Sequence, residues 1–171
     1  MALTQRKAIY CAALAAAAGG AAGAHHLKTP SAAAHGPSSV LTIRTTDFAF
    51  QAADRLSMGR VTLLLRNEGL VPHEARLVRF EDGHTLRDLE REVSGLAPTL
   101  PLSLPAWVTE VGTLGAVAPG GEGRTTLSLR RGHHAILCLM PLTDGSAALM
   151  KGMYHALEVV ESPSGSAPGL D

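Results

Sequence analysis

The sequence predicts an all-β fold, a Greek-key antiparallel β-sandwich that carries one short helix. Short segments in which apolar and polar residues alternate recur along the chain, as strands with one buried face require. Turn residues separate these segments, and a single stretch places its apolar residues at helical spacing. About seven short strands with these features are typical of one sandwich domain, and 171 residues suffice to build it.

The first half of the predicted domain contains three strands and the helix. Alternation predicts strands over residues 40–50 and 61–65, and a third strand that starts at His73. Thr85 and Asp88 have the spacing of a capping box, so we expect a helix over residues 85–95. Prolines make residues 98–105 a surface crossing rather than a central strand.

In the second half of the domain, the same alternation predicts strands over residues 111–117, 126–130, 134–138 and 154–160. Period-two alternation places His134, Ile136 and Cys138 on one face of the third of these strands. A loop over residues 141–151 then leads to Met153 and the last strand.

The N-terminal segment has the features of an export signal. Arg6 and Lys7 precede an alanine-rich apolar stretch, and small residues at 22–24 suit a signal peptidase, although an uncleaved anchor remains an alternative. We therefore predict a signal peptide or anchor over residues 1–24, a flexible linker over 25–38, a folded domain over 39–161 and a disordered tail over 162–171. This organisation predicts a periplasmic or secreted protein.

Composition and motifs exclude several classes of function. Fifteen Lys+Arg balance fifteen Asp+Glu, so no charge excess indicates nucleic acid or an anionic membrane surface as a partner. The chain contains no Gly-x-Ser-x-Gly elbow, His-Glu-x-x-His helix or Cys-x-x-Cys pair. We therefore predict that the protein is not an enzyme.

Cys138 is the most informative single residue. Cleavage after Ala24 removes Cys11 and leaves Cys138 as the one cysteine, so no disulfide can form within the chain. A lone thiol in an oxidising compartment is a liability unless it is buried or bound to a partner. The alternatives for this residue are a metal-bound thiolate and a buried, inert thiol that packs as a small hydrophobe.

Two segments resemble the cupredoxin family of blue-copper proteins, which includes plastocyanin and azurin. Residues 67–73 read Asn-Glu-Gly-Leu-Val-Pro-His and resemble that family's Asn-x-Gly-x-x-Pro-His turn, which supplies the first copper ligand. Residues 132–138 resemble its Gly-x-Tyr-x-x-x-Cys approach strand, and the path from Cys138 through Pro141 to Met153 resembles its ligand loop. The resemblance implies a copper site formed by His73, Cys138 and Met153.

The expected set of copper ligands is incomplete. Family members place a second histidine four or five residues before the methionine, where this chain has Ala148 and Leu149. His155, His134 or a partner protein remain as other sources of an imidazole. Cu(I) binding by Cys138 and Met153, helped by Met140 or Met150, is also consistent with soft-ligand chemistry. Glu74 stands where the family often has an asparagine that fastens the ligand loop.

Two functions are consistent with these features. The first is an exported, copper-associated protein linked to periplasmic electron transfer, with a redox protein or a membrane complex as its partner. The second is a metal-free cupredoxin descendant that works as a structural or interaction subunit of a membrane electron-transfer complex. The retained cysteine and methionine favour the first, and the missing histidine favours the second.

Overall fold

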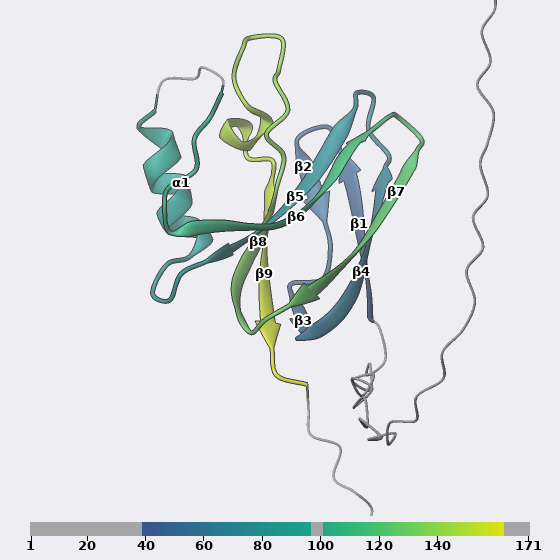
Figure 1. Cartoon of the computed structure of the whole chain (residues 1–171). Coiled ribbons are helices and arrows are strands. Elements are labelled where there is room, and N and C mark those ends of the chain that lie inside the picture. Colours follow the sequence, from purple (N-terminus) through teal and green to yellow (C-terminus); the bar gives the residue numbers. More distant parts are fainter. Residues whose placement is uncertain (1–38, 97–100, 163–171) are drawn as a thin grey trace, which may run out of the picture. The chain divides into compact units, whose positions relative to one another are not determined.

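The computed structural model describes residues 39–96 and 101–162 (Figure 1). The predicted signal or anchor, the predicted linker and the predicted tail beyond residue 162 lie outside these described residues. The predicted helix and most of the predicted strands are confirmed. The strand predicted over residues 40–50 is instead divided by a turn into Ser39–Thr46 and Ala49–Gln51, and the short strand Arg55–Ser57 was not predicted.

Two β-sheets form the body of the domain. The four-stranded sheet has the order β2 (Ala49–Gln51), β1 (Ser39–Thr46), β4 (Gly59–Asn67) and β7 (Glu122–Leu129). The five-stranded sheet has the order β3 (Arg55–Ser57), β9 (Tyr154–Val160), β8 (Gly132–Leu137), β5 (His73–Phe80) and β6 (Val108–Val117). The chain crosses between the sheets from β4 to β5, from β6 to β7 and from β7 to β8, as Greek-key connections require.

The predicted sandwich is confirmed, but its sheets are mixed rather than purely antiparallel. β1 pairs with β4 in parallel, and β3 pairs with β9 in parallel. The first parallel pair arises because short β2 and β3 return the chain to the end where β1 began, so β4 runs in the same direction as β1. The alternation of apolar and polar residues along a strand does not report its direction relative to a neighbour.

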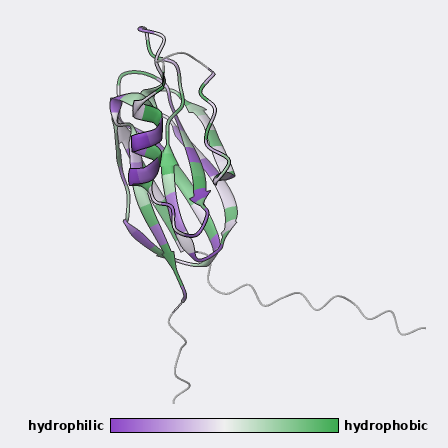
Figure 2. Ribbon diagram, turned by 90° about the vertical axis from the view of Figure 1, so that its left-hand side faces the viewer, coloured by the Kyte–Doolittle hydropathy of each residue, from purple (hydrophilic) through white to green (hydrophobic). Residues whose placement is uncertain are grey.

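The inner faces of the two sheets bury the main core. Aliphatic side chains from both sheets, among them Leu41, Leu63 and Ile136, pack there with the sulfur-containing Cys138 and Met153. This composition agrees with the low aromatic content of 4%. Hydrophobic and hydrophilic residues alternate along the strands in Figure 2, as expected for sheets with one buried face.

A second, smaller core lies on the outer face of the five-stranded sheet. Helix α1 (Leu86–Ser94) packs Leu89 and Val93 against Phe80 and Leu137 there. The predicted capping box is present, because the carboxylate of Asp88 accepts hydrogen bonds from the Thr85 N–H and the Thr85 hydroxyl at 2.9 and 2.8 Å. Within the described residues, no helix has the length and apolar character needed to cross a bilayer.

Eight strand termini meet at one end of the sandwich. β1, β4, β6 and β8 end there, while β2, β5, β7 and β9 begin there, as the strand pairings show. The predicted loop over residues 141–151 belongs to this end and contains a short 3-10 helix, η1 (Ala148–Lys151), which the sequence pattern did not predict. The residues predicted to bind copper all lie at this end.

Candidate metal centre

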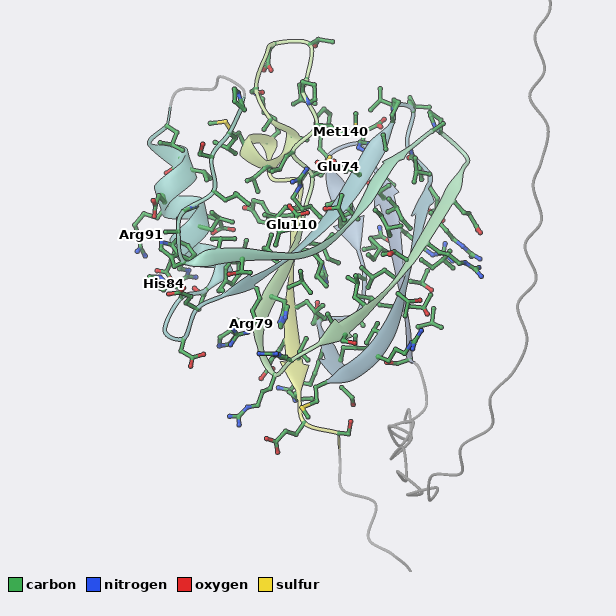
Figure 3. All side chains as sticks on the ribbon, in the orientation of Figure 1. Glu74, Arg79, His84, Arg91, Glu110 and Met140 are labelled. Carbon is green, nitrogen blue, oxygen red and sulfur yellow. The ribbon has the colours of Figure 1, made fainter. Side chains whose placement is uncertain are left out.

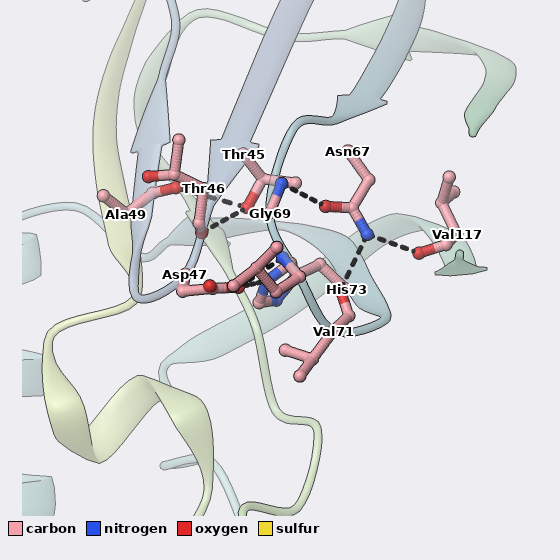
Figure 4. A network of polar contacts seen from close by, with 10 residues as sticks. Thr45, Thr46, Asp47, Ala49, Asn67, Gly69, Val71, His73 and Val117 are labelled. Atoms are coloured by element: carbon pink, nitrogen blue, oxygen red, sulfur yellow. Dashed lines mark hydrogen bonds and ion pairs between the residues drawn. The ribbon is translucent and has the colours of Figure 1, made fainter. Parts of the chain in front are cut away.

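A turn anchored by Asn67 delivers His73 to the first position of β5. The Asn67 side chain is buried and donates hydrogen bonds to the carbonyls of Val71 and Val117, both at 2.8 Å (Figure 4). Its Oδ1 accepts the N–H of Gly69 at 2.9 Å. Because this one amide ties β4, the turn and β6 together, it holds the segment that ends at His73.

The His73 ring is 3% exposed and has a carboxylate beside it. Its Nε2 lies 3.3 Å from Oδ1 of Asp47, which belongs to the turn between β1 and β2 (Figure 4). Sequence reasoning missed Asp47, because 26 residues separate it from His73 and no motif links the two.

Cys138 follows the last residue of β8 and is fully buried. Its N–H donates to the carbonyl of Met153 at 3.1 Å, and its carbonyl accepts the N–H of Leu149 at 2.7 Å. Burial raises the pKa of the thiol, while hydrogen bonds from the backbone N–H groups of Glu74 and Met140 to the sulfur lower it in part. The desolvation effect is the larger, so the metal-free protein holds a neutral thiol.

Glu74 connects the histidine segment to the cysteine segment. A register shift in the pairing of β5 with β6 falls between His73 and Ala75, where a β-bulge re-aims the backbone. Oε1 of Glu74 accepts the N–H of Leu139, the residue after Cys138, at 3.0 Å. Glu74 therefore fastens the ligand loop in the position where the family often has asparagine.

Met153 is fully buried and immediately precedes β9. The chain reaches it through η1 and Gly152, whose φ of 91° lies in the left-handed region that glycine tolerates best. The Met153 N–H then donates to the carbonyl of Ala148 at 3.2 Å. These contacts place Met153 next to both Cys138 and Ala148.

A pocket of about 630 Å³ opens beside these residues. His73, Met140 and Ala148 line it, together with an apolar rim that includes Phe48 and Val71. Ala148, at the predicted place of the missing histidine, and His73 both line this pocket. Figure 3 labels Met140 and Glu74 among the side chains of the domain.

The two histidines considered as replacement ligands do not line this pocket. His155 lies on the inner face of β9. Its Nε2 lies 3.2 Å from Oδ1 of Asp54, but the two groups are not aligned for a hydrogen bond. His134 lies four residues before Cys138, about 13 Å along a strand, and its Nδ1 donates to the Gly132 carbonyl at 3.1 Å. Met150, unlike Met140, is also absent from the pocket lining.

The structure thus places the three predicted ligands at the same end of the sandwich. Within residues 39–96 and 101–162, no three His, Cys, Asp or Glu side chains form a group that would hold a metal ion. Two strong donors, His73 and Cys138, and one thioether, Met153, are what this end of the sandwich offers.

Two mixed sheets joined by Greek-key crossings form a cupredoxin-like β-sandwich. His73, Cys138 and Met153 are buried at one end of it. The chain is similar to reduced auracyanin from the photosynthetic bacterium Roseiflexus castenholzii, at 19% identity over 73% of this chain and 99% of that chain, with a TM-score of 0.49. An azurin, Az-iso2, from Methylomonas sp. strain J is 12% identical over 73% of this chain and 100% of that chain, with a TM-score of 0.46. Auracyanin A, a "blue" copper protein from Chloroflexus aurantiacus, is 17% identical over 71% of this chain and 100% of that chain, with a TM-score of 0.43.

At these levels of sequence identity, the similarity to the solved structures concerns the fold alone. No protein-family model and no curated protein matches the sequence. The fold that the resemblance of residues 67–73 and 132–153 implied agrees with the two-sheet sandwich of the structure.

Proposed function

We propose that this protein binds one copper ion through His73, Cys138 and Met153, and that it works as an exported, non-enzymatic protein linked to electron transfer. One observation carries the proposal. Cys138 is fully buried, its N–H donates to the carbonyl of Met153 at 3.1 Å, and the carboxylate of Glu74, the residue after His73, accepts the N–H of Leu139 at 3.0 Å. These bonds join the three segments of the chain that carry the proposed ligands.

The donor set fits copper in its softer, monovalent state. Thiolate and thioether ligands select Cu(I), and an imidazole suits either oxidation state. A blue-copper site has a second imidazole in the trigonal plane, and Ala148 leaves that position open. When bound, copper supplies one-electron exchange between Cu(I) and Cu(II).

The residues of the chain have separable tasks at this site. Cys138 would hold the metal as a thiolate after losing its thiol proton to solvent, and backbone hydrogen bonds from Glu74 and Met140 lower the pKa of this thiol in part. His73 supplies the imidazole, and Met153 supplies a weak thioether from the protein interior. The pocket beside Ala148 lets water or a small ligand approach the metal.

The proposal also includes the location of the protein and its partner. The basic and then apolar N-terminal sequence supports a periplasmic or secreted location. Phe48, Leu70 and Val71 are exposed large side chains near the pocket, where a redox protein or a membrane complex would approach. A balanced charge of fifteen basic and fifteen acidic residues argues against nucleic acid as a partner.

Copper titration of the purified protein tests the site. We expect one Cu(I) per chain, measured by competition with a chromophoric chelator, and visible thiolate-to-copper absorption after loading with Cu(II). Cys138→Ala removes a ligand, so it should lower the affinity more than about 100-fold, since even outer-shell partners of metal sites are worth 10–100-fold. Met58→Leu, which removes an exposed sulfur beside Val160 at the far end of β9, is the control and should change neither result. Absence of uptake in both oxidation states would contradict the proposal.

Restoring the missing imidazole provides a second prediction. Ala148→His places a ring where the pocket already has room beside His73, so Cu(II) affinity and visible absorption should both increase. Thr143→His introduces a histidine elsewhere in the same pocket lining and is the control for a nonspecific gain. Equal gains in the two variants would show that position 148 is not the open ligand position.

A metal-free interaction module is the second candidate. The incomplete ligand set favours it, as does the exposed apolar rim, in which Phe48 is 49% and Leu70 84% exposed. The copper titration separates the two candidates, because a module of this kind binds no copper and its thermal stability does not respond to copper.

A further inference from the structure

Asp47 lies beside the buried ring of His73, outside every motif that points to copper. We propose that Asp47 is a positioning residue, whose carboxylate holds His73 in the tautomer that keeps the Nδ1 lone pair available to a metal. The metal-binding part of this inference rests on the proposed function, whereas the tautomer is a property of the metal-free protein.

The contact between the two side chains determines the tautomer. Oδ1 of Asp47 lies 3.3 Å from Nε2 of His73, and an ionised carboxylate only accepts hydrogen bonds. Nε2 must therefore carry the proton. A neutral imidazole has one N–H, so its Nδ1 keeps a free lone pair. In metal sites, a carboxylate on the second ring nitrogen orients the ring and increases its basicity in the same way.

The carboxylate is itself held in place. Its Oδ1 accepts the N–H of Leu70 at 2.9 Å, and this bond is the largest cause of the lowered pKa of Asp47. A Cβ at Gly69 would lie 2.6 Å from Oδ1 and 3.1 Å from Nε2 of His73. The backbone of the turn therefore packs directly against the Asp47–His73 pair, and only glycine at position 69 permits this approach.

The conformation of the next residue indicates a constrained turn. Phe48 has a φ of 70°, in the left-handed region that a residue with a Cβ rarely adopts. Thr46 pairs with Ala49, so Asp47 and Phe48 alone make the turn between β1 and β2. Backbone strain persists where the surrounding structure imposes it, and here the bonds of Asp47 to Leu70 and His73 do so.

Nitrogen-15 NMR of the metal-free protein tests the tautomer directly. We expect wild-type His73 to be protonated at Nε2 alone, and Asp47→Ala to show a mixture of the two tautomers. Asp47→Asn keeps an acceptor oxygen and should retain the wild-type tautomer. Gly69→Ala should perturb the signal without any change of charge, because its methyl group displaces the carboxylate.

Cu(I) affinity tests the consequence for the metal. Asp47→Ala should weaken binding by about 10–100-fold, the usual effect of removing an outer-shell partner. Asp47→Asn should weaken it by less than about tenfold, since a neutral hydrogen bond replaces a charged one. Asp54→Ala, which removes the carboxylate beside His155, is the matched control and should leave both the His73 tautomer and the affinity unchanged.

The two measurements separate the inference from the proposed function. An unchanged His73 tautomer in Asp47→Ala and Gly69→Ala would overturn the positioning role, whatever the copper affinity. A changed tautomer in a protein that binds no copper would support the positioning role and overturn the copper function. A changed tautomer with unchanged Cu(I) affinity would overturn the claim that Asp47 acts on the metal.

Discussion

Phe48 is the residue other than glycine that has a positive φ within the described parts of the chain, at 70°. Its half-exposed ring lines the pocket beside His73, so the strain of the β1–β2 turn is located at the candidate site. A left-handed conformation costs an ordinary residue about 1–2 kcal/mol relative to glycine.

This strain predicts an unusual order of stabilities. Phe48→Gly and Phe48→Ala lose the same ring, but only glycine relieves the backbone, so Phe48→Gly should be the more stable variant by about 1 kcal/mol. At the exposed Val71, whose φ is not positive, glycine should instead be less stable than alanine by about 0.5–1 kcal/mol. Chemical denaturation of the four variants measures both differences. Equal stabilities at position 48 would show that the turn carries no strain.

Glu74 shows how a single changed side chain preserves a connection. Its carboxylate is one methylene longer than the carboxamide of asparagine but still reaches an N–H of the ligand loop, at Leu139. A carboxylate at this position can therefore fasten the loop as a carboxamide would, because a backbone N–H donates to either kind of oxygen.

Helix α1 is attached to the outer face of the five-stranded sheet by few side chains, so its N-terminal cap contributes to keeping it in place. Asp88 receives hydrogen bonds from both the hydroxyl and the N–H of Thr85. These contacts, the hydroxyl first, lower the pKa of Asp88. A carboxylate near a helix N-terminus also interacts favourably with the helix dipole.

The capping box predicts a pH-dependent contribution of Asp88 to stability. A carboxyl group whose folded-state pKa lies below its unfolded value stabilises the fold above the unfolded pKa, and this contribution is lost as the pH falls through the folded pKa. The stability difference between wild type and Asp88→Ala should therefore be full at pH 6 and shrink below about pH 4. Denaturant unfolding from pH 7 to 2.5 measures it. Asp82→Ala, at a fully exposed carboxylate, is the control and should show little difference at any pH.

The stability of the whole domain depends on a neutral histidine between the sheets. His134 is buried, and burial lowers its pKa, helped by the positive charge of Arg79 and opposed by the hydrogen bond to Gly132. Its Nε2 has no hydrogen-bond partner among the described residues. Protonation would place an additional charge in the sandwich.

His134 therefore predicts a loss of stability on mild acidification. Because the folded-state pKa is lower than the unfolded value near 6.5, the unfolded chain binds more protons, and stability falls as the pH decreases below about 6.5. His134→Gln should weaken this dependence between pH 7 and 5, while His133→Gln, at an exposed neighbour, should retain it. Melting temperatures across this range provide the measurement. The same pH slope in wild type and His134→Gln would contradict the prediction.

At the scale of the whole molecule, alternation and spacing in the sequence determined most of the architecture. They predicted the strands, the capped helix and the buried face that carries Ile136 and Cys138, since burial of one strand face requires apolar residues at every second position. The resemblance of two segments to the cupredoxin family also predicted that His73, Cys138 and Met153 share one end of the domain, and all three lie at that end.

Only the tertiary structure decided how distant segments meet. The parallel pairs β1–β4 and β3–β9 depend on where short strands return the chain, which side-chain alternation does not encode. The Asp47–His73 contact, the distance of His134 and His155 from the pocket, and the hydrogen bond from Glu74 to the ligand loop all join residues far apart in sequence. Such contacts form only when the sheets pack, so the chemistry around His73 is a property of the folded sandwich rather than of any one motif.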